Sequence, residues 1–426
     1  MIAKRIITTT LLLFTLSLLF TTAAHAQVLR GQWVDQTEQQ IKQNRMRDVR
    51  VIVLDHNGNP VHNASVQITQ QRHAFTWGVV LPKDGLAQAG LELDGSQPVW
   101  RCFNALSLQN MTQWGDLQPA MNAGMRTKKV RQAIDLANAW GMKIRWGTLI
   151  HSDEGLNPEW TVPLKGRSLA TMLERYVRLI MLEYGAHVDE FDVYSGVLDR
   201  DFLGQTLGNG IIRQLFEQAK ADAPKASLCM GFSDSLLGKR RRDMIAKVTS
   251  LREALIPVDR LAIDQEVSGV ILPAVMSRSL AWLNTVNMNV VISSLHVTGE
   301  SEAGAALNLE MMLRLLFAEK AVQGVYFSNI TPSPNSPNDQ IGTLITTDGQ
   351  LTATGAVLEK MLKKQWWTND RQTTDELGNA NFKVYAGSHR IRVTLPNDQR
   401  ITATMWIEPP SKESTERLIL IEPLKE

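Results

Sequence analysis

Strict alternation of apolar and polar residues marks both ends of this chain. Residues 49–70 alternate around Asn57-Gly58-Asn59-Pro60, a pattern typical of a β-hairpin. The same period of two returns over residues 378–408, where Gly387-Ser388 and Pro396-Asn397 interrupt it. We therefore expect the two ends to form a small β-domain or a pair of β-appendages.

Between these ends, short apolar runs alternate with amphipathic helical patterns. In residues 168–184 the apolar positions recur at the helical period, which predicts a helix with one face packed on a sheet, and Gly185 follows as a stop signal. Further helices are predicted at 128–140, 211–221, 277–286, 305–321 and 354–363. Eight apolar runs predict strands, at 75–80, 102–108, 143–150, 190–196, 227–232, 260–264, 289–295 and 324–329. Eight strands with intervening helices predict an α/β fold, a (β/α)8 TIM barrel, with its site at the carboxyl ends of the strands.

The first residues read as a targeting segment. Lys4 and Arg5 precede a short apolar run that ends in Ala24-His25-Ala26, which predicts a cleaved signal peptide over residues 1–26 and a secreted or periplasmic protein. A transmembrane helix is the alternative, but the run is short and lacks a basic stop-transfer flank, so we expect no membrane span. The expected domains are a β-hairpin or β-flank at 27–71, the barrel at 72–367 and a β-rich appendage at 371–426.

Composition limits the classes of partner. The chain has 45 Lys and Arg against 43 Asp and Glu, and no basic stripe, so we expect no nucleic-acid partner. Its 44% hydrophobic residues are enough for a large core. An exported protein with two cysteines invites a disulfide, but Cys102 and Cys229 fall on strands far apart around the barrel, so we expect both to be unpaired and buried.

Three segments carry a resemblance to a known family. "RHAFTWG", "FNALSLQNMTQWGDLQP" and "ANAWGMKIRWGTLIHSDEGLNPEW" resemble the first three strands of glycoside hydrolase family 10, the endo-β-1,4-xylanases. The order and spacing of the remaining strands are similar as well. The resemblance implies a barrel that hydrolyses xylan with retention. It would use one Glu at the end of strand 4 as acid/base and a second at the end of strand 7 as nucleophile, with the carboxyls about 5 to 5.5 Å apart.

Both of these catalytic positions differ here. The strand-4 motif is read as "FDVYSG", which puts Gly196 at the acid/base position, and the strand-7 motif is read as "SSLH", which puts Ser294 at the nucleophile position. Glycine cannot transfer a proton, and serine without an adjacent base is a poor nucleophile. We therefore predict a family-10-like barrel that no longer performs the family's hydrolysis, a pseudoenzyme.

Binding can persist without hydrolysis. Aromatic rings stack on sugars and amides read their hydroxyl groups, although tryptophans at barrel rims also commonly pack loops. The family's Asn and Trp of strand 2 are retained as Asn110 and Trp114, while their neighbours are Gln109 and Gln113 in place of Glu and Lys. The residues expected to contact a glycan are Asn110, Trp114, Arg145, His151, Trp160, Gln265 and His296.

A relocated acid pair would preserve activity. The candidate carboxylates at strand ends are Asp192, Asp199, Asp234, Asp264 and Glu266, and we single out Glu266 because His296 on the next strand is a potential acid/base partner. A metal site built from His151, Asp153, Glu266 and His296 is conceivable from placement alone, but their spacing does not support it. We therefore expect neither a metal nor a cofactor.

Three functions remain open at this stage. The first is an inactive barrel that binds xylan-like polysaccharide or a partner protein. The second is an active glycoside hydrolase that acts on a β-linked polysaccharide through relocated carboxylates. The third is a structural or adhesion platform that acts through the β-appendages. The sequence predicts no oligomeric state.

Overall fold

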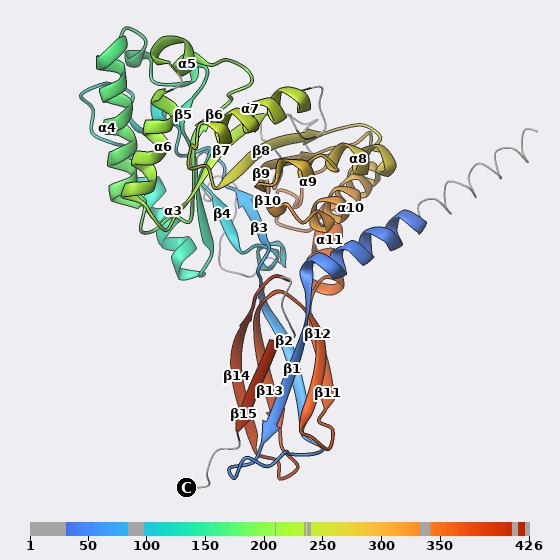
Figure 1. The fold of residues 1–426 in the computed structure, drawn as a ribbon. Helices are drawn as coiled ribbons and strands as arrows, with labels where there is room; N and C mark the ends of the chain where they lie inside the picture. The colour runs from blue at the N-terminus through green and yellow to red at the C-terminus, as the bar shows by residue number, and fades with distance from the viewer. Residues whose placement is uncertain are drawn as a thin grey trace, which may run out of the picture.

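A barrel and a β-sandwich lie end to end in this chain (Figure 1). The computed structural model describes residues 31–83, 98–208, 210–233, 236, 240–332, 341–410 and 416–421. The expected signal peptide at 1–26 lies outside these residues. Within the described part of the chain, no helix combines the length and apolar character needed to cross a bilayer.

The barrel is closed by eight parallel strands in the order β10-β3-β4-β5-β6-β7-β8-β9, which confirms the predicted (β/α)8 fold. β6 is buried along its whole length, because helices cover its outer side and side chains fill the barrel interior. The strands are β3 (Thr76–Val80), β4 (Ala105–Ser107), β5 (Lys143–His151), β6 (Glu190–Ser195), β7 (Ser227–Ser233), β8 (Arg260–Val267), β9 (Asn289–Val297) and β10 (Val322–Phe327).

Helices surround the barrel, and their apolar stripes explain their packing. In α4 the buried positions include Leu169, Leu173 and Ile180, the side predicted to face the sheet. The predicted helix at 277–286 is two short helices, α8 and α9. A helix over residues 31–45 precedes β1. The helices of the barrel region are α2 (Trp114–Leu117), α3 (Lys128–Ala139), α4 (Gly166–Tyr184), α5 (Phe202–Leu207), α6 (Gly210–Asp222), α7 (Arg241–Glu253), α8 (Pro273–Leu280), α9 (Leu283–Val286), α10 (Glu302–Ala318) and α11 (Ala353–Glu359), with a π-helix at Lys360–Gln365.

The two ends of the chain build one sandwich of two sheets, ordered β12-β1-β15 and β11-β2-β13-β14. The hairpin predicted at 49–70 is wrong, because β1 pairs with β12 and β15 whereas β2 pairs with β11 and β13. The apolar faces of both sheets share one core. The strands are β1 (Met46–Leu54), β2 (Ser65–His73), β11 (Asn369–Thr373), β12 (Asn379–Tyr385), β13 (Gly387–Thr394), β14 (Arg400–Ile407) and β15 (Glu416–Ile421).

An aromatic junction joins the sandwich to the barrel. The ring of His73, at the end of β2, lies 6.4 Å from that of Trp77 in the barrel and 6.1 Å from that of Tyr385 in the sandwich, centroid to centroid. Burial lowers the pKa of His73 to about 3, so the ring is neutral. Cys102 and Cys229 are buried and unpaired, as predicted.

Candidate functional site

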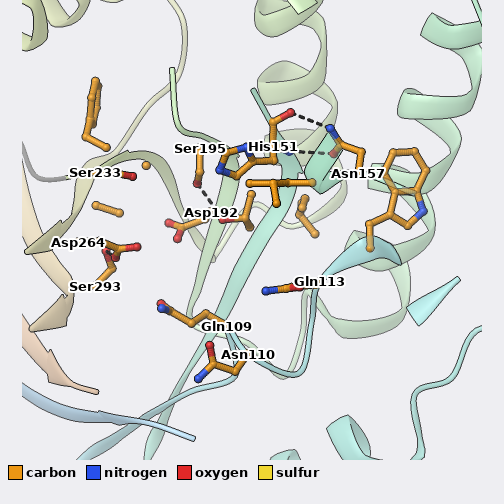
Figure 2. A pocket seen from close by; sticks show the side chains of 17 residues that line it. Gln109, Asn110, Gln113, His151, Asn157, Asp192, Ser195, Ser233, Asp264 and Ser293 are labelled. Atoms are coloured by element: carbon orange, nitrogen blue, oxygen red, sulfur yellow. Dashed lines mark hydrogen bonds between the residues drawn. The ribbon is translucent and has the colours of Figure 1, made fainter. Parts of the chain in front are cut away.

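A polar cavity of about 200 Å³ opens at the carboxyl ends of the barrel strands. Figure 2 shows amide, hydroxyl and carboxyl groups converging on it. Gln109, Asn110 and Gln113 come from the loop after β4, and Asp192 and Asp264 come from β6 and β8. The other lining residues are Trp114, Thr148, Leu149, His151, Leu156, Asn157, Ser195, Gly231, Phe232, Ser233, Ala262 and Ser293.

A group of four charged residues forms the floor beneath the cavity. The guanidinium of Arg145 is fully buried and makes ion pairs with both Glu190 and Asp192. Arg260 lies 2.7 Å from the second oxygen of Glu190, so two cations balance two anions. Burial opposes the charged form of Arg145, but the Asp192 carboxylate raises the pKa of Arg145 above its ordinary value. The group is thus electrically neutral and held inside the barrel.

Asp192 belongs to this floor and also reaches the cavity. Burial raises the pKa of Asp192 above its ordinary value, while Arg145 opposes that shift. One of its carboxylate oxygens, Oδ1, is buried without a hydrogen-bond partner among the described residues. Oδ1 is therefore a buried acceptor that the described residues leave unpaired, beside the cavity.

Asp264 is the second cavity carboxylate. Its Oδ1 accepts a hydrogen bond of 2.5 Å from Ser293 Oγ on the neighbouring strand β9. Its side chain is open to the cavity, although protein encloses it on the other sides, and this desolvation raises its pKa to about 6. The charge of Asp192 contributes to that rise, so the two carboxyls act on each other within one site.

Gly196 directly follows β6 and has a backbone that suits only glycine. Its φ is +78°, in the left-handed region, and a Cβ built there would lie 2.6 Å from His151 Cε1 and 2.7 Å from Ser152 Oγ. The His151 ring is anchored because the backbone N–H of Asp153 donates to its Nδ1 at 2.9 Å. Burial lowers the pKa of His151, which favours a neutral ring with its proton on Nε2. An imidazole therefore occupies the space that a side chain at position 196 would need.

β9 carries the two serines of the strand-7 motif, and Ser293 is the one that lines the cavity. Its Oγ donates to Asp264 Oδ1. The pairing of β8 with β9 shifts register between Ile263 and Asp264, beside these serines. The assignment of the family's nucleophile position to Ser294 stays a prediction.

The seven residues expected to contact a glycan separate into two groups. Asn110, Trp114 and His151 line the cavity. Trp114 is nonetheless a packing residue, with its ring stacked 4.2 Å from that of Tyr176 and only 2% exposed. The structure places the remaining four outside the lining: Arg145, Trp160, Gln265 and His296.

The side chains of these four residues lie elsewhere in the barrel. Arg145 lies in the floor, and Trp160 is half-buried against Trp114 with its Nε1 donating to the carbonyl of Gln118 at 2.9 Å. Gln265 is buried, and its amide donates to the backbone oxygen of Glu266 at 2.7 Å. His296 is half-buried on β9.

The proposed pair of Glu266 and His296 is adjacent in register but does not line the cavity. Glu266 lies two residues beyond Asp264 on the same side of β8, about 6.6 Å further along the strand. The carboxylates that line the cavity are Asp192 and Asp264. The feature that distinguishes them from Glu266 is how far along its strand each residue lies. Among the described residues, no group of three or more His, Cys, Asp or Glu side chains could hold a metal ion.

A closed (β/α)8 barrel whose mouth carries a polar, carboxylate-containing cavity is the architecture of barrel enzymes that act on small polar substrates. The profile of glycosyl hydrolase family 10 matches residues 68–333, more than half of the chain. The chain belongs to this family.

Comparison with individual proteins agrees with this assignment. The chain is 22% identical over 374 residues to anti-sigma-I factor RsgI6 of Acetivibrio thermocellus, covering 88% of this chain and 48% of that protein. It is 20% identical over 385 residues to endo-1,4-beta-xylanase 1 of Arabidopsis thaliana, covering 89% of this chain and 39% of that protein. The chain thus spans less than half the length of each. The structure of xylanase 10B from Thermotoga petrophila with xylobiose is similar in fold, with a TM-score of 0.58 and 15% identity, over 68% of this chain and 95% of that one.

Proposed function

We propose that this chain is an exported, non-hydrolysing member of its family, whose barrel binds a xylan-like glycan. The observation that carries the proposal is the strand-4 position, where Gly196 provides no carboxylate and the His151 ring fills the adjacent space. A retaining mechanism needs an acid/base there. The curated relative with 22% identity is named an anti-sigma-I factor, whereas two relatives with 20% identity are named endo-1,4-beta-xylanases, so the proposal rests on the site and not on these names.

The cavity suits recognition of a sugar. Its neutral polar groups include the amides of Gln109, Asn110 and Gln113 and the hydroxyls of Thr148 and Ser195, which hydrogen-bond to each other at 3.0 Å. Amides and hydroxyls both donate and accept, as sugar hydroxyls do. Asp192 Oδ1 adds an acceptor that is still unpaired among the described residues. A volume of about 200 Å³ favours one or two sugar rings over a long segment of chain.

Calorimetric titration of the mature protein with xylo-oligosaccharides tests binding. Gln113 is exposed and lines the cavity, so Gln113→Ala should weaken binding about two- to tenfold through loss of a hydrogen bond. Gln323→Ala is the matched control, because Gln323 lies near the start of β10, at the opposite end of the barrel. Absence of heat at millimolar oligosaccharide would contradict glycan binding. N-terminal sequencing of the exported protein should begin at Gln27.

A second candidate is hydrolysis by relocated acids, and one observation favours it. Asp192 and Asp264 line the same cavity and interact electrostatically, and a pKa of about 6 at Asp264 suits a general acid. This candidate predicts release of reducing sugar from xylan that Asp264→Asn abolishes. The binding proposal predicts no release by the parent protein, so one assay separates the two.

A further inference from the structure

The outer face of the four-stranded sheet in the sandwich carries a cluster of arginines. Register places four of them on this face: Arg371 on β11, Arg390 and Arg392 on β13, and Arg400 on β14. All four are exposed. We call this surface the arginine face, and Figure 1 shows its sheet extending away from the barrel.

The positions around these arginines are polar and uncharged. Successive residues of a strand point to opposite sides, so the positions paired with the arginines share their face. Arg371 pairs with Gln67, which pairs with Arg392, which pairs with Thr402. The remaining rows contribute Ser65, Thr69, Asn369, Thr373, Thr394 and Thr404. The acidic residue of β11, Asp370, pairs with the buried Ile68 and so belongs to the other side.

The arginine face therefore holds positive charge without compensation. Arg390 and Arg392 are two residues apart on one strand, about 6.6 Å, and Arg371 is two strands from Arg392, about 10 Å. No ion pair to any of the four is present among the described residues. The guanidinium of Arg371 donates to the amide oxygen of Gln67 at 3.5 Å, and its backbone N–H donates to Asp370 Oδ1 at 2.7 Å. Like charges this close repel each other, and a bound anion relieves that repulsion. The chain's formal net charge is only +2, so this concentration is local.

A hollow of about 650 Å³ lies over part of this face. It is lined by Arg371, Arg392 and Arg400 together with Ser65, Gln67, Val393, Thr394 and Thr402. Guanidinium groups bind carboxylates through paired hydrogen bonds, and the hydroxyl and amide rows can bind sugar hydroxyls. Trp406, 46% exposed, lies on the same face opposite Ser388 and offers a ring for stacking.

We propose that the arginine face binds an acidic polysaccharide through its uronate carboxylates. A membrane surface is disfavoured because Trp406 is the one large apolar side chain on the described part of this face, which leaves little to insert among lipids. The preference for a polysaccharide over nucleic acid rests on the proposed glycan-binding function. The surface itself is separate from the barrel cavity and needs no ligand there.

The test uses the whole mature chain and polygalacturonate as the probe, in affinity electrophoresis and calorimetry. We expect binding that weakens as sodium chloride rises and that is absent with the carboxyl-reduced form of the same polymer. The double variant Arg371→Gln/Arg392→Gln should weaken it at least about tenfold, while Arg371→Lys/Arg392→Lys should retain part of it. The control Arg241→Gln/Arg242→Gln removes the same charge from exposed positions on α7 and should change binding little.

Three results would overturn this proposal: no binding of polygalacturonate, equal loss in the α7 control, or tighter binding of duplex DNA than of polygalacturonate at the same salt. Thermal unfolding of each variant identifies any that fail to fold. If the glutamine variant does not fold, binding of polygalacturonate by the Arg371→Lys/Arg392→Lys variant decides the test, and binding equal to the parent's would count against the proposal. Failure of the barrel to bind neutral xylo-oligosaccharides is measured separately and does not change the outcome for the arginine face. The two proposals can therefore fail independently.

Discussion

Substitution of Gly196 by alanine tests the central geometric statement about the site. Two costs add at this position. An L-residue held in the left-handed region costs about 1–2 kcal/mol, and forcing a Cβ to within 2.6 Å of the anchored His151 ring adds about 1–3 kcal/mol. We expect Gly196→Ala to lower the free energy of unfolding by about 2–5 kcal/mol.

A matched glycine separates these costs. Gly58 has a φ of +85°, in a turn closed by its N–H to the carbonyl of Asp55, and nothing lies within 4 Å of a Cβ built there. Gly58→Ala should therefore show the backbone cost alone, about 1–2 kcal/mol. Adding His151→Ala to Gly196→Ala removes the overlap with the ring, so the double variant should be more stable than the sum of the single variants predicts.

Urea denaturation followed by tryptophan fluorescence measures all four variants against the parent. A loss at Gly196 no larger than at Gly58, or full additivity with His151→Ala, would refute the claim that the imidazole occupies the side-chain space. The same reasoning applies to restoring the family's acid. Gly196→Glu alone should misplace its carboxylate, and a restoration experiment should therefore combine it with His151→Ala.

Two further predictions concern the charged groups. Arg145→Met should cost about 3–5 kcal/mol of unfolding free energy, because Asp192 would remain buried without its cation and Glu190 would keep Arg260 alone. Arg213→Met, at an exposed pair with Glu217, should stay within about 0.5 kcal/mol of the parent. Equal losses in urea denaturation would contradict this. For Asp264 the folded pKa of about 6 exceeds the ordinary 3.8, so its contribution to stability is full below about 3.8 and is lost as pH rises through 6. Asp264→Asn should therefore gain in melting temperature relative to the parent between pH 4 and pH 7, and a constant difference would be the contrary result.

The barrel could be predicted from sequence because its information is local. Each parallel strand is buried on both sides and reads as an apolar run, and each crossover helix shows its own period. The sandwich could not be predicted in the same way. The alternation in β1 and β2 is as expected, but the partners of β1 are β12 and β15, which lie more than 300 residues away along the chain. A turn sequence such as Asn57-Gly58 favours a hairpin, whereas packing of two sheets on one core decides the pairing.

The candidate site was predictable in its general position and not in its chemistry. In the sequence, Asp192, Asp264 and Glu266 are all candidate carboxylates at strand ends. Asp264 lines the cavity and Glu266 does not, because Glu266 lies two residues further along β8. Of the two neighbouring serines of β9, Ser293 lines the cavity and bonds to Asp264, and the sequence motif by itself does not indicate which of the two does so. The tryptophans were the least reliable candidates for glycan contact, since Trp114 and Trp160 pack against each other and Trp114 also stacks on Tyr176.

The buried charged floor and the residues at the cavity opening have different effects on folding, which bears on the proposed loss of hydrolysis. Arg145, which the family resemblance includes, is tied to two buried carboxylates, so any loss there leaves uncompensated charge inside the barrel and costs folding energy. Gly196 lies above that group, in a turn. Glycine adopts the left-handed backbone there without strain, and its lack of a side chain avoids a clash with the imidazole of His151. Under the proposed function, a glycine at the acid/base position removes a catalytic group without disturbing the buried charges that the barrel needs to fold. On this reasoning, a family match at the buried charged floor indicates common ancestry and a shared requirement for stability. Activity must be argued from the residues that line the cavity opening.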